Sequence, residues 1–579
     1  MDPPESGIRS DPSVNRVCDS GDVTLTVNGT IQRRGSDAVV DVLRSENVPF
    51  VFGNPGTTEL TLLEALGDAP DLQYVLALQE ATAVGMADGY AQATGRPGVV
   101  ILHTLGGLAN GIGNLANARS MNVPMVVMAG QQDVRDLIGD PVLAGDLTRV
   151  AGPVAKWTHE VRRRDEIGTI LRRAFHDAVS PPAGPVFVSL PMNLLEEIGE
   201  VHVPERSTID RRAVGGGIAD LADELLRVTP GRLAIVVDML ATSGVTDALI
   251  GVAEATGARV FGAAWGSTNA FPTAHPLWAG GLPSTAAEIR STLAEFERIL
   301  LVGGNMFRIL LHSPGSPLPD GVQVLHLSAD PLQLGRTYPT RLGVLGDPAA
   351  TLEAMLPRVR AHADAAGARQ VLEQARTDRA RRSLARQQQV DSRSGAWPVA
   401  PIVAAHALVQ ALPCDAIIVD EAPAIMAHIR AFHEVSRPGR YFGVRGGGLG
   451  WGMPAALGVS LGTGREPVLC TVGDGSAMYA PQALWTAAHE HLPVIFAVVN
   501  NREYDILRKS EAALDRMNGG NGHAVGLDLA DPPMRFTDLA RAHGVAATSI
   551  ERLTDVGEVL RSVWSTGEPH LLEIPLARD

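Results

Sequence analysis

The stretch Gly473-Asp474-Gly475-Ser476 decides the fold of this 579-residue chain, because it joins an apolar strand, residues 468–472, to a helical segment. Glycines let backbone approach a phosphate closely, and the amides at a helix start favour anions. Asn500-Asn501 ends the next predicted strand, so Asn501 lies 27 positions beyond Asp474. These two residues offer the hard oxygen ligands that magnesium prefers. A Gly-Asp-Gly turn alone is common in loops, and it is the paired asparagines that favour a phosphate and magnesium site.

The strands around this motif belong to a regular alternation of short apolar runs and helices. Such alternation indicates a parallel sheet with helices on both faces. It recurs in three blocks, and a chain of this length is expected to form about three domains. We therefore predict an α/β protein in which each domain is a mainly parallel sheet flanked by helices. The expected strands are 50–52, 74–78, 99–102 and 125–128, then 234–237, 259–261, 299–302 and 322–327, then 417–419, 468–472, 494–499 and 570–574.

Composition between these blocks sets the expected boundaries. Residues 1–34 are rich in Pro, Ser, Asp and Gly, which predicts a flexible N-terminal extension. The stretch 348–398 is rich in Ala and Arg with few strand formers, which predicts a helical connection. We expect an N-terminal domain at 35–205, a central domain at 206–350, a linker at 351–398 and a C-terminal domain at 399–579.

The charge balance argues against a nucleic-acid partner. The chain has 49 Lys and Arg against 64 Asp and Glu, a formal net charge of -15, and should repel phosphate backbones. The nearest basic cluster is interleaved with Ala, Gln and Leu, and we interpret it as a solvated helix or linker face. It comprises Arg369, Arg376, Arg379, Arg381, Arg382 and Arg386.

Hydrophobic residues make up 45% of the chain, the balance of a globular protein. The three cysteines lie far apart and form no CxxC pair, which fits a reducing cytoplasm. No run of 18 apolar residues and no secretory pattern at the N-terminus is present, so we expect a cytoplasmic protein without a membrane partner.

Ligand sites form at the carboxyl ends of parallel strands, so the loops after the predicted strands are where chemistry is expected. Glu80 follows the strand at 74–78 and begins a helix at 81–93. Gly85 and Gly89 in that helix would permit close packing. A simpler alternative is that Glu80 only stabilises the positively charged end of the helix.

A Gly-Asp-Gly turn followed some 25 to 30 residues later by two asparagines is similar to the fingerprint of thiamine diphosphate enzymes. The resemblance covers nearly all residues from Gly35 to Pro575. It is most specific at Phe52–Leu60, Leu78–Glu80 and Leu102-His103, which resemble the benzoylformate decarboxylases within the 2-keto acid decarboxylase family.

The resemblance implies a cofactor diphosphate bound through Mg²⁺. The implied metal ligands are the side chains of Asp474 and Asn501 and the main-chain carbonyl of Glu503. Leu449 is expected to prop the cofactor into a bent form, while Gly447 offers its carbonyl to the cofactor amino group. The remaining implied cofactor contacts are Gly473, Gly475 and Ser476.

The resemblance also assigns acid–base roles in the first two domains. Glu80 is expected to protonate a nitrogen of the aminopyrimidine ring, and Asn110 matches a cofactor-contacting position, although it could instead be a helix cap. His103 and His275 are the implied proton-transfer groups. Acetolactate-forming relatives typically lack a histidine at the position of His103. A loop or core histidine without a role is the alternative for both residues.

Several positions depart from the family pattern around the expected substrate. Thr57 stands where those decarboxylases have a serine, and Ile506 and Ser510 replace a small and an aromatic residue. Ala422-Pro423-Ala424 stands where hydroxyl residues often contact the diphosphate, and Pro423 has no amide proton to donate. The pocket, formed by Thr57, His103, His275, Ile506 and Ser510, leaves the choice of 2-keto acid open.

The resemblance thus implies non-oxidative decarboxylation of an aryl or branched 2-keto acid to an aldehyde and CO₂. Two alternatives stay open: a carboligase of the acetolactate synthase type, and a cofactor-binding protein that has lost turnover. In the family, one active site takes residues from two chains, which implies a homodimer or homotetramer. Some relatives also bind a flavin, which nothing in this sequence predicts.

Overall fold

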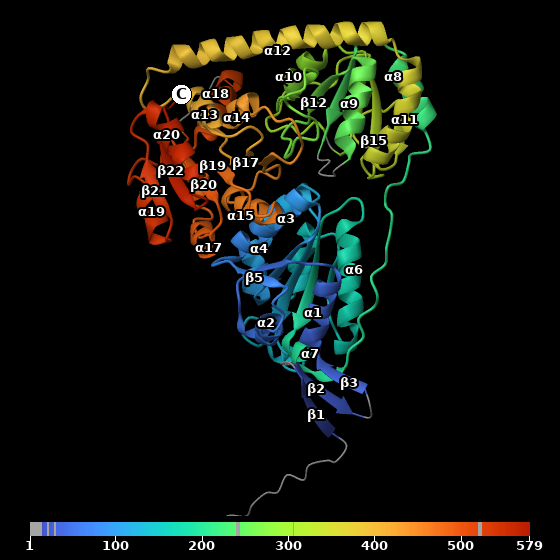
Figure 1. The fold of residues 1–579 in the computed structure, drawn as a ribbon, viewed down its shortest axis with the longest axis vertical. Helices are drawn as coiled ribbons and strands as arrows, with labels where there is room; N and C mark the ends of the chain where they lie inside the picture. Colours follow the sequence, from blue (N-terminus) through green and yellow to red (C-terminus); the bar gives the residue numbers. More distant parts are fainter. Residues whose placement is uncertain are drawn as a thin grey trace, which may run out of the picture.

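The computed structural model describes residues 14–19, 22–27, 30–238, 244–304, 306–518 and 524–578. These residues form three six-stranded parallel sheets, each flanked by helices, and one small antiparallel sheet (Figure 1). The predicted α/β class with three domains is confirmed. All twelve expected strands are present, with bounds within three residues of the prediction.

The N-terminal sheet has the order β5-β4-β6-β7-β9-β8. Its two faces are buried beneath separate apolar cores, as parallel strands require. Strand β9 was not expected, because its continuously buried sequence PVFVSLP has no alternation to reveal it. The strands are β4 Phe50–Gly53, β5 Gln73–Leu76, β6 Gly98–Leu102, β7 Met125–Gln131, β8 Thr158–Glu160 and β9 Pro185–Pro191. The helices are α1 Gly35–Ser45, α2 Leu60–Gly67, α3 Glu80–Thr94, α4 Thr104–Ser120, α5 Leu147–Ala151, α6 Ile167–Val179 and α7 Met192–Glu196.

The central sheet has the order β13-β12-β11-β14-β15-β16. Helix α11 belongs to this domain, because Leu352, Met355 and Val359 are buried in its core. The linker therefore begins later than the predicted residue 351. The strands are β11 Leu233–Val237, β12 Arg259–Gly262, β13 Trp278–Gly281, β14 Arg298–Val302, β15 Gln323–Ser328 and β16 Leu342–Leu345, and the helices are α8 Ile218–Leu226, α9 Val245–Thr256, α10 Ala286–Leu293 and α11 Pro348–His362.

The C-terminal sheet has the order β18-β17-β19-β20-β22-β21. Strands β19 and β20 are its neighbouring central strands, so the predicted motifs at their ends share one sheet edge. The strands are β17 Ile417–Glu421, β18 Tyr441–Gly443, β19 Val468–Gly473, β20 Val494–Asn500, β21 Ala546–Ser549 and β22 His570–Pro575. The helices are α13 Pro401–Ala411, α14 Met426–Phe432, α15 Gly452–Gly462, α16 Asp474–Ala477, α17 Ala483–His489, α18 Asp505–Asn518, α19 Phe536–Ala542 and α20 Leu553–Trp564.

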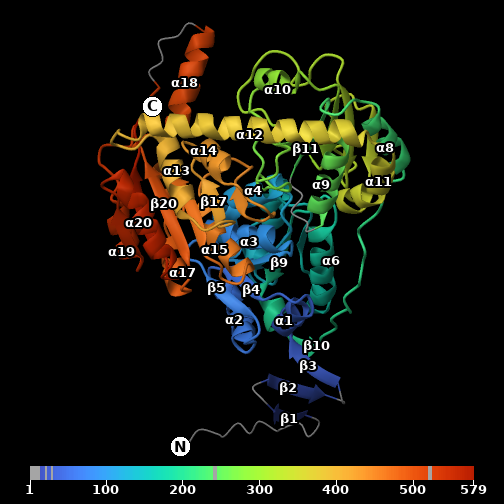
Figure 2. The same ribbon diagram turned by 45° about the horizontal axis from the view of Figure 1, so that its top comes forward.

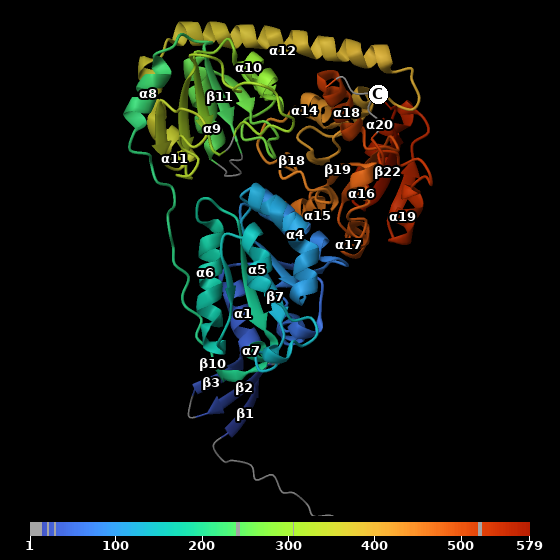
Figure 3. The same cartoon turned by 180° about the vertical axis from the view of Figure 1, so that it is seen from behind.

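A single helix of 29 residues, α12 Ala365–Arg393, joins the central and C-terminal domains. At 1.5 Å per residue it is roughly 43 Å long. It runs across one end of the molecule above both domains, as seen from either side (Figures 1 and 3). The predicted helical connection between these domains is confirmed.

The segment before residue 35 differs from the expected loose extension. Strands β1 Val14–Asp19, β2 Asp22–Val27 and β3 Thr30–Arg34 form an antiparallel sheet with β10 Ile198–Glu200. In the sequence, an Asn-Gly dipeptide at 28–29 separates the residues of β2 and β3, and this dipeptide is typical of hairpins. Pairing of β3 with β10 then ties the hairpin to the body of the protein.

The first and third domains meet where helices α3 and α15 cross. A side chain at Gly85 would lie 2.7 Å from Pro454, and side chains at Gly89 and Gly458 would overlap the backbone of the opposite helix. The predicted close packing through Gly85 and Gly89 is therefore confirmed, and it fixes the site residue Glu80, at the start of α3, relative to α15. Among the described residues, no helix is both long and apolar enough to cross a membrane.

Candidate active site

Glu80 opens helix α3 at the carboxyl end of β5 and is only 7% exposed. Its carboxylate accepts hydrogen bonds from Asn110 Nδ2 at 3.0 Å and from Asn54 Nδ2 at 3.4 Å. Asn110 lies in the second turn of α4, so it is not the helix cap that the sequence left open. Two amides, one from the loop after β4 and one from helix α4, thus hold one buried carboxylate in place.

His103 follows strand β6 and is fixed by a carboxylate that sequence reasoning missed. Its Nδ1 donates to the buried Glu59 Oε2 at 2.9 Å, while Thr58 Oγ1 donates to Glu59 Oε1 at 2.6 Å. Side chains at Gly56 or Gly130 would overlap this group. Because Nδ1 carries the shared proton, Nε2 at the opposite edge of the ring is left as the reactive nitrogen.

The loops after β4 and β6 each have one further feature that is expected of a functional site. Thr57, expected in the substrate pocket, is exposed in the single chain. Thr104, directly after His103, has φ +50°, a conformation that β-branched residues rarely adopt. Strained backbone of this kind is concentrated at functional sites.

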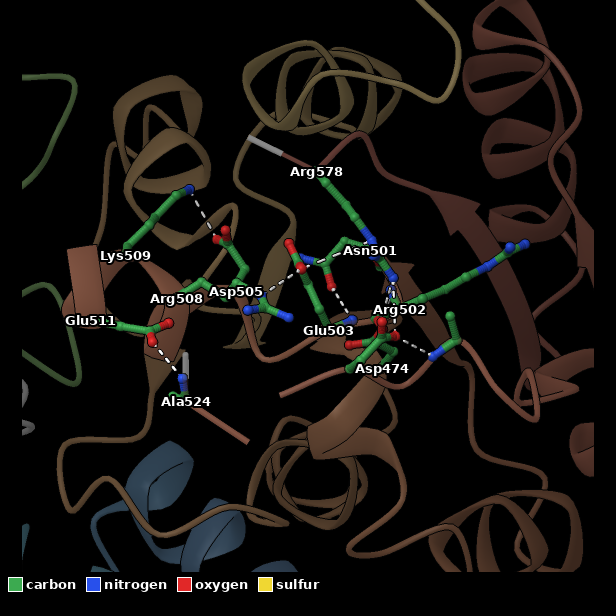
Figure 4. A network of polar contacts seen from close by, with 12 residues as sticks. Asp474, Asn501, Arg502, Glu503, Asp505, Arg508, Lys509, Glu511, Ala524 and Arg578 are labelled. Atoms are coloured by element: carbon green, nitrogen blue, oxygen red, sulfur yellow. Dashed lines mark hydrogen bonds and ion pairs between the residues drawn. The ribbon is translucent and has the colours of Figure 1, made fainter. Parts of the chain in front are cut away.

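Asp474 lies at the end of β19 and is 4% exposed. Its Oδ1 accepts from the amide of Gly475 at 2.8 Å and its Oδ2 from the amide of Arg502 at 2.7 Å (Figure 4). Burial raises the pKa of Asp474, and these backbone donors act in the opposite direction. Arg502 has φ +60°, which turns its amide toward the carboxylate.

Asn501 and Glu503 lie beside Asp474, as Figure 4 shows. Asn501 Oδ1 accepts from the Glu503 amide at 3.2 Å. Arg578 holds this turn from the C-terminus, because its Nε donates to the Asn501 carbonyl at 3.1 Å and Nη2 to the Arg502 carbonyl at 2.9 Å. The structure thus brings together the three residues expected to bind metal.

The donor set fits a divalent cation. Asp474 is a buried carboxylate without an ion pair to any side chain in the described part of the chain, and buried charges need a counter-charge. One carboxylate, one side-chain amide oxygen and a main-chain carbonyl are the hard ligands of a magnesium site. Within the described ranges, no three His, Cys, Asp or Glu side chains gather as an alternative metal centre.

The glycine-rich loop before α15 lies at the start of the helix that packs on α3. Gly447 has φ +78°, and Leu449 is half-buried beside it. Asn117 of α4 accepts from the Gly448 amide and donates to its carbonyl, each at 3.0 Å. The loop is therefore positioned by the N-terminal domain as well as by its own.

A second missed carboxylate, Glu421, supports the same loop. It is buried at the end of β17 and accepts from the amides of Gly450 at 2.7 Å and Gly452 at 2.5 Å. Burial raises its pKa to about 7. An apolar strand that ends in Asp420-Glu421 was a usable signal, because buried acids at strand ends need a structural or functional reason.

His275 lies apart from these groups within the single chain. Its Nε2 is 3.3 Å from Glu254 Oε1 and its ring packs on Phe271 with a centroid distance of 5.1 Å. Arg379 of α12 donates to its main-chain carbonyl at 3.4 Å. These contacts are with the central domain and α12, so one chain does not bring His275 together with His103.

Ile506 and Ser510 lie on α18, which stands away from the body of the protein (Figure 2). Ile506 is exposed and accepts, through its carbonyl, a hydrogen bond from Ser510 Oγ at 2.7 Å. Lys509 Nζ pairs with Asp505 at 2.9 Å. The helix is thus held at its start, and its apolar residues lie open beside the Asn501 turn.

The chain matches three family models: the thiamine pyrophosphate enzyme N-terminal binding domain at 33–145, the central domain at 222–355 and the C-terminal binding domain at 425–574. It is 33% identical to benzoylformate decarboxylase of Pseudomonas aeruginosa, over 93% of this chain and 98% of that protein. It is 28% identical to the acetolactate synthase isozyme 3 large subunit of Escherichia coli, over 88% of each.

Solved structures agree with these similarities. Thiamine diphosphate-dependent 4-hydroxybenzoylformate decarboxylase of Rhodococcus jostii RHA1 is 28% identical with a TM-score of 0.82, covering 94% of this chain and all of that one. Benzoylformate decarboxylase of Polynucleobacter necessarius is 27% identical with a TM-score of 0.83, covering 94% and 99%. The chain therefore belongs to the thiamine pyrophosphate enzyme family, in its decarboxylase and acetolactate synthase branch.

Proposed function

We propose that this enzyme uses thiamine diphosphate and Mg²⁺ to decarboxylate an aryl or branched 2-keto acid, without oxidation, to an aldehyde and CO₂. The observation that carries the proposal is His103, whose Nδ1 is bound to the buried Glu59 so that Nε2 is free to transfer a proton. Decarboxylation to an aldehyde requires a proton at the reacting carbon, and this histidine lies at the same sheet edge as Glu80.

The residues at the ends of β19 and β20 would hold the cofactor diphosphate. Asp474, Asn501 and the Glu503 carbonyl would bind Mg²⁺, and Gly473, Gly475 and Ser476 would approach the phosphates. Leu449 and Gly447 would contact the rings. Bound thiamine diphosphate supplies an electron sink for the electrons released when CO₂ leaves.

Glu80 would hold a proton against the aminopyrimidine ring. Asn54 and Asn110 keep the carboxylate oriented, so the geometry is set before the cofactor binds. His103 would donate a proton to the reacting carbon, and His275 would assist product release.

We propose that two chains share each site. Exposed apolar side chains surround the Asp474 and Asn501 loops, and exposed groups of this kind mark interfaces. Tyr479 is 57% exposed and Leu507 48%. A homodimer or homotetramer would cover these groups and bring His275 of one chain to His103 of another.

Substrate choice would depend on Thr57, Ile506 and Ser510. The methyl group of Thr57 narrows the pocket relative to serine, and an exposed aliphatic side chain at 506 offers apolar contact without an aromatic ring. Single-methyl differences of this kind are worth roughly 1–3 kcal/mol in discrimination. The apolar contact at residue 506 supports aryl or branched substrates over pyruvate-sized ones, and the narrower pocket at Thr57 would limit their bulk.

The similarity to acetolactate synthase supports one alternative, in which the decarboxylated fragment is passed to a second carbonyl. We would incubate the holoenzyme with aromatic, branched and short 2-keto acids and measure CO₂ and carbonyl products separately. Free aldehyde in step with CO₂ is the expected result. A 2-hydroxyketone without free aldehyde would contradict the proposal, and cofactor binding with no CO₂ from any acid would indicate a protein without turnover.

A further inference from the structure

A cavity of about 170 Å³ lies between the central domain, helix α14 and the inward face of α12. It is separate from the loops that carry Glu80, His103 and Asp474. Four arginines line it, three from α12 and one from α14, against a single glutamate. The excess of positive charge around this cavity requires an explanation, because like charges held close together repel one another.

The three α12 arginines come from the basic cluster that the sequence suggested was a solvated face. Ala375 and Val390 are buried on this helix, and Arg379, Arg382 and Arg386 lie between them on the same face and are partly buried. The spacing of three and four residues places all five on one side of a helix. Arg369, Arg376 and Arg381 point outward and are exposed, as expected.

Two of the four arginines have structural partners. Arg379 donates to the Thr273 carbonyl at 2.8 Å and pairs with Glu434 at 2.6 Å. Arg430 donates to the Gly266 carbonyl and stacks over Tyr441, with 4.9 Å from its guanidinium carbon to the ring centroid. These contacts join α12 and α14 to the central domain. Glu434, the single glutamate that lines the cavity, is already paired with Arg379.

Arg382 and Arg386 have no hydrogen bond or ion pair to any described residue. Burial, the first cause in each case, lowers the pKa of both guanidiniums. For Arg382 the neighbouring Arg259 lowers the pKa further and Asp378 acts in the opposite direction, and for Arg386 Glu434 acts in the opposite direction. An anion bound between Arg382 and Arg386 would offset the repulsion between their positive charges.

Two buried polar atoms of the lining residues also have no partner in the described chain. His433 is 5% exposed, its Nε2 donates to the Ala416 carbonyl at 2.9 Å, and its Nδ1 is unpartnered. Burial lowers its pKa to about 4, so the ring is neutral and Nδ1 is an acceptor. Thr268 Oγ1 is likewise buried without a partner. The residues that line the cavity therefore supply arginine donors and, beneath its surface, two unpartnered polar atoms.

We propose that this cavity binds an oxyanion that carries a hydroxyl group, either inorganic phosphate or the phosphate group of a small monoester. Arg382 and Arg386 bind its oxygens, and His433 Nδ1 and Thr268 Oγ1 are the groups available to its hydroxyl. Arg379 also holds the main chain at Thr273 and His275, so the bound anion lies next to the segment that carries His275.

Titration calorimetry on the enzyme saturated with thiamine diphosphate and Mg²⁺ tests the site directly. Inorganic phosphate is expected to saturate one site per chain, and sulfate, which has no hydroxyl at neutral pH, to bind several-fold more weakly. Glycerol phosphate identifies the source: tighter binding than phosphate indicates a monoester, and equal or weaker binding indicates phosphate. If none of the three anions binds outside the cofactor site, the proposal is wrong.

Substitutions locate the binding. Arg382→Gln with Arg386→Gln is expected to weaken phosphate binding at least roughly tenfold, because charge-assisted bonds are lost. Arg369→Gln with Arg376→Gln removes the same charge from the exposed face of α12 and should leave binding unchanged. Thr268→Val serves as an uncharged second variant if the arginine pair does not fold, and should also weaken binding. Equal affinity in wild type and in both cavity variants would overturn the assignment.

Discussion

At the residue scale, the carboxylate of Glu80 is buried and is held in place by hydrogen bonds from Asn54 and Asn110. Glu80→Gln keeps the shape of the side chain but cannot hold the proton. We expect decarboxylation to fall by roughly 10²–10⁴-fold, the usual contribution of general acid–base catalysis. Steady-state kinetics with the best 2-keto acid would measure this.

The matched control is Glu64→Gln, because Glu64 forms an exposed ion pair with Arg34 and its carboxylate is 67% exposed. Its turnover should equal that of wild type. Unchanged turnover in Glu80→Gln, with normal folding and cofactor content, would remove Glu80 from the mechanism.

Glu59 is expected to act through His103, because its carboxylate contacts Nδ1 and not the open side of the site. Glu59→Gln should lower kcat about tenfold or more with little change in KM, since it replaces the carboxylate that accepts the hydrogen bond of Nδ1 and orients the ring. In a His103→Ala background the same substitution should have no further effect on kcat. A double-mutant cycle measures this coupling. Additive losses would show that Glu59 does not work through His103.

These two carboxylates show where sequence reasoning stopped. Glu80 could be predicted because a strand, a helix start and a family motif all point to it. Glu59 is two positions from Thr57 in the sequence, but His103, which it contacts, is 44 positions away. Nothing local in a sequence states which distant side chain a buried acid will meet.

At the scale of elements, helices α3 and α15 cross closely and bury a carboxyl group between them. Asp88 on α3 is fully buried and accepts from Gln92 Nε2 at 2.6 Å. Burial raises its pKa from 3.8 to about 7. The folded protein therefore keeps a proton on Asp88 that the unfolded chain releases at lower pH.

The sign of the pH dependence follows from this raised pKa. The stabilisation is fully present below about pH 4 and is lost as the pH rises through about 7. Asp88→Asn, which cannot ionise, should flatten the decline in the free energy of unfolding between about pH 4 and 7. The difference is expected to be on the order of a few kcal/mol. Denaturant unfolding across this range would test it, and parallel curves for the two proteins would contradict it.

Strands and helices were the most predictable elements, because the period of apolar residues reports them locally. The crossing of α3 and α15 was predicted only in part. Gly85 and Gly89 indicated that another element packs closely on α3, but not that this element is α15. The short edge strands β8, β13, β16 and β21 were not predicted, since few of their residues are buried, and β18, although buried, has only three residues. Helix α11 was assigned to the linker because its composition, and not its buried stripe at Leu352, Met355 and Val359, guided the boundary.

At the scale of the whole molecule, the separation of His275 from His103 within one chain leads to a prediction about assembly. Glu80→Gln and Asp474→Asn should each inactivate a homo-oligomer. If the two halves of a site come from different chains, mixed assemblies contain one intact site per hybrid pair. Purified hybrid pairs should then have roughly half of wild-type activity, because one site of two is intact.

Co-expression of the two variants with different affinity tags, followed by purification on both tags, would provide the hybrids. Mixing the separately purified, non-exchanging proteins is the control and should stay inactive. Hybrids without activity would place each site within a single chain.

Helix α12 lies on the surface, and the number of residues between its two buried contacts is fixed by the domains that it joins. Its buried residues Ala375 and Val390 anchor it to different domains, so every residue inserted between them would rotate one anchor by 100° and shift it by about 1.5 Å relative to the other. A single alanine inserted after Ser383 should therefore lower the melting temperature more than Ser383→Ala, which tests the same exposed position. We therefore expect α12 to tolerate substitutions at its exposed positions but not insertions or deletions. The length of this helix fixes the distance between two domains that share no sheet.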